Sequence, residues 1–78
     1  MELTEENVNW CIDFMEAIAA ENGRSIQLVE IDSGTKTIKV RFTATGDTSY
    51  MTNETLLEIL DNHFKKEIPD YAEVVQVL

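Results

Sequence analysis

The sequence predicts an α+β fold in the order α-β-β-α-β, with two helices packed on one face of a small mixed three-stranded sheet. Two segments carry apolar residues at helical spacing, and each follows a threonine that can cap a helix. Between them lie two β-rich runs separated by a short glycine-containing turn, and a third β-rich run closes the chain. At 78 residues, the chain is expected to form a single domain covering residues 1–78.

The first helix is expected to start after Thr4, whose hydroxyl can cap the helix. Glu5 and Glu6 then lie in the first turn, where negative charge interacts favourably with the helix dipole. The helix should run to about Asn22, because Gly23 can adopt the left-handed conformation that ends helices. One stripe of this helix is apolar: Val8, Cys11, Ile12, Met15, Ile18 and Ala19.

An antiparallel hairpin is expected next, with strands over residues 25–32 and 35–44. The turn signal between them is Ser33-Gly34. The second strand alternates apolar and polar residues along its length, which predicts one buried face and one face in water. In the first strand, Val29 and Ile31 are out of phase with the earlier apolar positions unless a β-bulge intervenes.

A polar loop over residues 45–51 leads to Thr52, which can cap a second helix running to about Lys66. Pro69 ends this helical region, because the residue before a proline avoids the helical conformation. The final strand is predicted over residues 72–78. The apolar stripe of the second helix consists of Leu56, Leu57, Ile59, Leu60 and Phe64.

The charge of the chain suits a cationic protein partner, and the equally good alternative is that the acidity only keeps a small domain soluble. Its net charge is −9, and residues 1–22 carry six acids and no base. Nucleic-acid binders neutralise phosphates with Lys and Arg, so no nucleic-acid partner is expected. A KH-like RNA-binding domain is disfavoured for the same reason, and also because no G-x-x-G loop is present. No run of about 18 apolar residues exists and the N-terminus is acidic, so no membrane segment or signal peptide is expected and the location should be cytoplasmic.

Few residues suit catalysis or metal binding. Cys11 is the only cysteine, which excludes an intramolecular disulfide and an all-cysteine metal site in one chain. Its place in an apolar stripe predicts a buried thiol. His63 is expected to be half-buried with its N–H bonded to Glu67 one turn later, and a pH-sensitive or ligand-binding role is the minority alternative. No catalytic constellation can be assembled from the remaining residues, so no enzyme is expected.

Several segments, taken in order, resemble the NifU-like C-terminal (NFU) domain of iron–sulfur cluster assembly proteins. The family has a V-E-L-V-D-I-D-like first strand, a V-x-V-R-L-T second strand, a Thr-Leu opening its second helix and a K-E-x-I-P-E ending followed by V-x-x-V. The corresponding segments here are Ile26–Asp32, Ile38–Thr43, Thr55-Leu56, Lys66–Asp70 and Val74–Val77. The resemblance covers about Val8 to Val77 and implies the same α-β-β-α-β order.

The chain departs from the family at its functional loop. The family's CxxC cysteines correspond to Gly46 and Ser49 here, neither of which supplies a thiolate, and its Arg-Pro pair is replaced by Glu16-Ala17. The resemblance therefore implies a degenerate member that binds no cofactor and acts as a protein-interaction module. The alternative is a residual iron or iron–sulfur carrier whose site is completed by a partner's ligands.

The candidate partner-binding residues are aromatic or large and apolar. Trp10 and Phe14 lie on a shoulder of the first helix, where they either form a rim for a partner or fold over the sheet edge to complete the core. Tyr50 and Met51 are the second candidates, because they occupy the loop that holds the cluster in the family. The polar face of the sheet is the third. The identity of the partner stays open, and a monomer or weak homodimer is expected.

Overall fold

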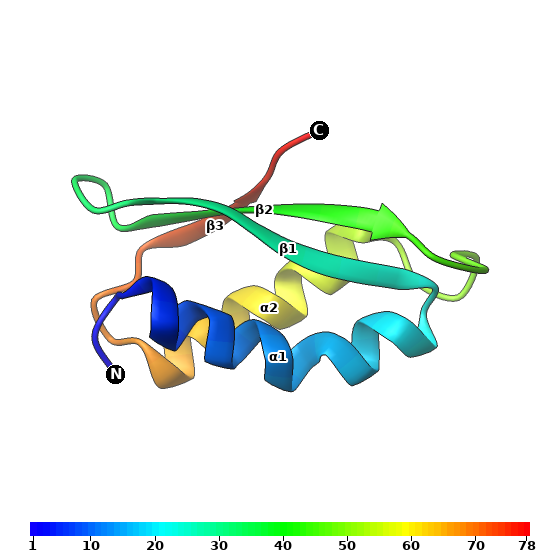
Figure 1. Ribbon diagram of the computed structural model, residues 1–78, viewed down its shortest axis with the longest axis horizontal. Helices are drawn as coiled ribbons and strands as arrows, with labels where there is room; N and C mark the ends of the chain where they lie inside the picture. The colour runs from blue at the N-terminus through cyan, green and yellow to red at the C-terminus, as the bar shows by residue number, and fades with distance from the viewer.

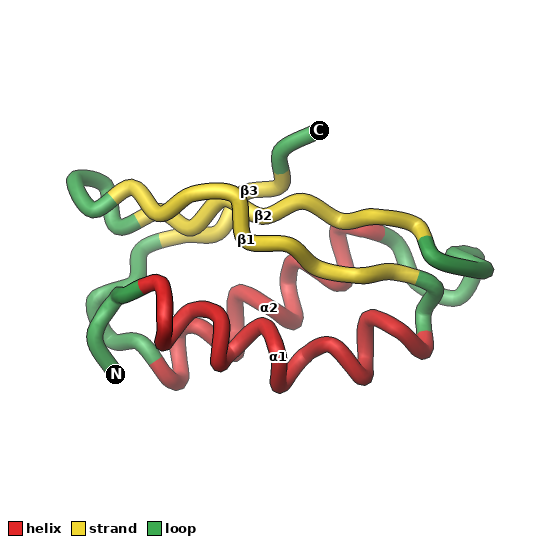
Figure 2. The backbone as a smooth tube through the Cα atoms, viewed as in Figure 1, coloured by secondary structure: helices red, strands yellow, loops and turns green.

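Two layers, one of helices and one of sheet, make up the computed structural model, which describes residues 1–78 (Figures 1 and 2). The predicted α-β-β-α-β fold is confirmed. Both helices lie on the same side of the sheet, whose strand order is β1-β2-β3. The elements are α1 (Glu5–Glu21), β1 (Arg24–Asp32), β2 (Thr37–Ala44), α2 (Asn53–Glu67) and β3 (Glu73–Gln76).

The first helix begins and ends where the sequence predicts. The Thr4 hydroxyl accepts a hydrogen bond from the backbone N–H of Asn7 at 3.2 Å, which satisfies one of the free donors of the first turn. At the other end, Gly23 has a φ of +71° and turns the chain into β1. The apolar stripe of this helix is buried through five residues: Val8, Cys11, Ile12, Met15 and Ala19. All five belong to the core, and Ile18, the sixth residue of the predicted stripe, is partly buried and packs against it, which confirms the stripe.

The hairpin contains the bulge on which its first strand depends. β1 and β2 pair antiparallel, with Leu28 opposite Val40, and the register shifts between Leu28 and Glu30. The extra residue, Val29, is left 44% exposed. After it, Ile31 pairs with Ile38 and packs against the core.

The third strand pairs parallel to β2 and is shorter than the predicted run over residues 72–78. Its pairing with β2 covers only the first half of that strand, from Thr37 to Val40. The N–H of Val77 still donates to the carbonyl of Val40 at 2.8 Å, but Leu78 is fully exposed. The C-terminus leaves the sheet at this point (Figure 1).

The core lies between the two layers. Its residues from α2 are Leu56, Leu60 and Phe64, all fully buried, as the apolar stripe predicts. Burying each such side chain contributes about 1.5–3 kcal/mol. The polar face of β2 was predicted to lie in water, and for Thr37 this is wrong, because Thr37 is only 6% exposed. It lies opposite Glu73 of β3, and its hydroxyl oxygen accepts a hydrogen bond from Thr35 at 2.8 Å.

Candidate interaction surface

Two large aromatic side chains lie on α1 outside the core. Trp10 is 50% exposed and Phe14 is 63% exposed. Four residues apart, they lie on the same side of the helix, and their rings stack with centroids 6.2 Å apart at 21°. Of the two arrangements left open by the sequence, the structure places these rings at the rim.

His63 of α2 extends this stack across the two helices. Its ring lies 5.0 Å from that of Phe14 and almost parallel to it, at 7°. His63 is half-buried, as expected, but the expected hydrogen bond to Glu67 is not formed, and Nε2 is buried without a partner. Stacking on Phe14 orients the imidazole instead. We call Trp10, Phe14 and His63 the aromatic row.

Exposed carboxylates flank the aromatic row. At 100° per residue, Glu6 and Asp13 lie within about 60° of Trp10 around α1 and within about one turn of it along the axis. Neither forms an ion pair within the chain. One exposed cation, Lys66, follows His63 by three residues on α2. The surface around the row is therefore apolar at its centre and mainly anionic at its border.

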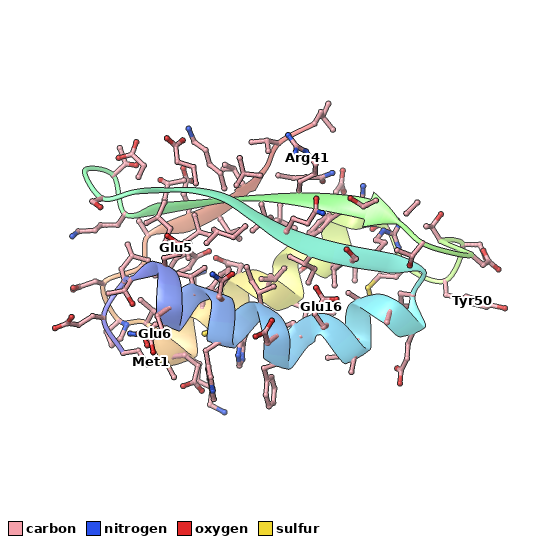
Figure 3. All side chains as sticks on the ribbon, in the orientation of Figure 1. Met1, Glu5, Glu6, Glu16, Arg41 and Tyr50 are labelled. Atoms are coloured by element: carbon pink, nitrogen blue, oxygen red, sulfur yellow. The ribbon has the colours of Figure 1, made fainter.

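The other predicted candidates lie elsewhere. The loop after β2 packs against the end of α1, because the carbonyl oxygen of Gly23 accepts hydrogen bonds from Thr45 (2.8 Å) and Gly46 (3.3 Å). Tyr50 is 79% exposed and points away from the body of the molecule (Figure 3), whereas Met51 packs partly against the core. Gly23 is thirteen residues beyond Trp10, so about 20 Å of helix separates the two surfaces.

The loop does not fit an iron–sulfur cluster. Gly46 and Ser49 are both exposed and provide no thiolate. The Asp47 carboxylate accepts a hydrogen bond from the Ser49 N–H at 2.9 Å, which lowers the pKa of Asp47. Cys11 is fully buried in α1, and the pKa of its thiol is raised by burial and by the nearby charge of Glu67. No three His, Cys, Asp or Glu side chains come together to hold a metal ion.

The third candidate surface, the sheet face away from the helices, is polar. Lys39 forms an ion pair with Glu30 at 2.9 Å, which raises the pKa of Lys39. Arg41 is exposed on the same face (Figure 3). The face presents charge and little apolar area, unlike the aromatic row.

Sequence reasoning missed two features of these surfaces. The half-buried position of His63 on α2 was predicted, but nothing in the sequence indicates that its ring stacks on Phe14, 49 positions earlier. Arg24 is 7% exposed, and its guanidinium donates to the Asn22 carbonyl at 3.0 Å and to the Asn53 side chain. These bonds join the end of α1 to the start of α2.

No family model matches the chain, and no curated protein matches it. None of its helices has the length and apolar character needed to cross a membrane.

Proposed function

We propose that this domain is a protein-interaction module, built on an NFU-like scaffold, that holds no cluster of its own and binds a partner through the aromatic row. The observation that carries the proposal is the exposure of two stacked aromatic rings on a helix that otherwise turns its polar side to water. Large aromatic side chains at the centre of a patch are the residues that most often dominate binding energy. The element order and the quoted sequence segments support the NFU relationship.

The row is preorganised for binding. Because Phe14 is held between Trp10 and His63, little side-chain freedom remains to be lost when a partner covers it. The partner we propose is a protein surface carrying arginine or lysine. Such a cation can lie against a ring face while its charge is met by the carboxylates of Glu6 or Asp13.

The alternative function is an iron or iron–sulfur carrier completed by a partner. Because Cys11 is buried, the partner would have to supply the thiolates. Anaerobic reconstitution of the pure protein with iron and sulfide, followed by absorbance and metal analysis, separates the two functions. A stoichiometric cluster on the isolated domain would overturn the part of the proposal that excludes one.

The interaction proposal is tested by capture from the native cell, with the bound protein identified and its affinity then measured. We expect the double variant Trp10→Ala/Phe14→Ala to weaken binding about thirtyfold or more, which corresponds to loss of a hot spot worth about 2 kcal/mol. Tyr50→Ala is the matched control, since it removes another exposed aromatic side chain. Equal binding by the double variant and the wild type would refute the proposal.

A further inference from the structure

A groove of about 440 Å³ runs between α2 and the free edge of β3. It lies on a different part of the molecule from the aromatic row. Its apolar lining comes from Leu57 of α2, from Ala72, and from Val74 of β3, which is 8% exposed. The lining residues are Glu54, Leu57, Glu58, Asp61, Lys65, Ala72, Glu73 and Val74.

The charges in this groove are unbalanced. Four carboxylates face one ammonium group, and that group, on Lys65, is already paired with Asp61 at 2.8 Å. Glu54, Glu58 and Glu73 form no ion pair within the chain. Glu54 and Glu58 are one helical turn apart, so they repel each other while the groove is empty. A cation placed there would relieve that repulsion.

The strand beside the groove has unused hydrogen-bonding groups. β3 pairs with β2 on one side only, so alternate backbone N–H and C=O groups on its other side have no strand partner. The opposite edge of the sheet, β1, is interrupted by the bulge at Val29, which breaks a regular pairing edge. No register shift interrupts β3. The β3 edge is therefore the better template for an added strand.

We propose that this groove binds a short, extended, cationic segment of a partner protein as a fourth strand beside β3. Alternate side chains of that strand face α2, where the aliphatic stem of a lysine or arginine lies along Leu57 and its charge reaches Glu54 and Glu58. The side chains between them lie on the side of Glu73. A second copy of this chain is not the occupant, because each copy carries a net charge of −9.

The probe is an end-blocked eight-residue peptide of alternating lysine and valine. We expect its binding, followed by backbone amide chemical shifts, to perturb residues 72–76 and the groove side of α2. A peptide of equal charge, N-methylated at alternate backbone nitrogens on the pairing edge, should bind at least about tenfold more weakly, because it cannot form the strand hydrogen bonds. Equal binding of the two peptides would show that only charge attracts them and would overturn the proposal.

Two double variants with the same net charge locate the binding site. Glu54→Gln/Glu58→Gln should weaken binding roughly two- to thirtyfold, from two exposed ion pairs. Glu2→Gln/Glu21→Gln removes two exposed carboxylates outside the groove and should have a clearly smaller effect. The proposal is overturned if both double variants lose the same affinity or if the peptide does not bind at all. It is also overturned if raising the protein concentration alone produces the same amide chemical shift changes. Trp10→Ala/Phe14→Ala should leave peptide binding in the groove unchanged. Failure of the groove proposal can therefore be distinguished from failure of the proposal for the aromatic row.

Discussion

Replacing Gly23 with alanine tests how the loop after β2 is held against the end of α1. Gly23 has a φ of +71°, and a Cβ added there would lie 2.3 Å from the carbonyl oxygen of Asp47 and 2.6 Å from its carbonyl carbon. Both atoms belong to the backbone, so no side-chain rotation relieves the contact. The loop must move, although it is held by the hydrogen bonds from Thr45 and Gly46 to Gly23.

The expected loss of stability follows from two terms. The left-handed conformation costs a non-glycine residue about 1–2 kcal/mol. Moving the loop weakens two hydrogen bonds, each worth about 0.5–1.5 kcal/mol. Together they predict that Gly23→Ala lowers the free energy of unfolding by about 2–5 kcal/mol. A domain of this size has only about 4–12 kcal/mol in total, so this loss is a large fraction of its stability.

Urea denaturation followed by circular dichroism measures this difference, with Gly46→Ala as the matched control. A Cβ at Gly46 would meet only the Cα of Gly23, at 3.8 Å, and Gly46 has no positive φ. Its replacement should change stability by less than about 1 kcal/mol, since alanine reduces the entropy of the unfolded chain. If the two variants unfold at the same urea concentration, the account of Gly23 is refuted.

Two further predictions concern Tyr71 and Cys11. The Tyr71 hydroxyl donates a hydrogen bond to the Asp61 carboxylate. Hydrogen bonds from Lys65, the larger cause, and from Tyr71 lower the pKa of Asp61. The stability that these bonds add is therefore present above the ordinary carboxyl pKa and is lost as the pH falls through the lowered pKa of Asp61. Tyr71→Phe should therefore lower the free energy of unfolding by about 0.5–1.5 kcal/mol at pH 7, with a smaller difference as pH falls below about 4; an unchanged difference at pH 2 would contradict this. The buried thiol of Cys11 should react with a disulfide reagent at least about 10³-fold more slowly in the folded protein than in denaturant, and labelling at equal rates would disprove its burial.

Much of the fold could be predicted because it depends on local patterns. Threonine caps, helical spacing and strand alternation act over a few residues, and they place both helices and the hairpin to within one or two residues. The phase break at Val29 indicated a bulge, which the structure contains. The burial of Cys11 also follows from its position in the stripe of α1.

The candidate surfaces could be predicted only in part. Trp10 and Phe14 lie at an angle on α1 that suits either core or rim, and the spacing of the helices decides between them. The stack on His63 joins residues far apart in the chain. Thr37, on the polar face of β2, is buried because alternation does not register the cover provided by a neighbouring strand.

The helices, the hairpin and the apolar stripes follow from the amino-acid sequence, since each depends on residues near one another in the chain, and the excess of acid follows from composition. Which surfaces face water depends on how these elements pack. Packing α2 beside α1 leaves the aromatic row exposed, and the short β3 leaves a free strand edge beside the carboxylates of α2. Both surfaces are made by contacts between distant segments, and local patterning carries no information about the distances that such contacts set.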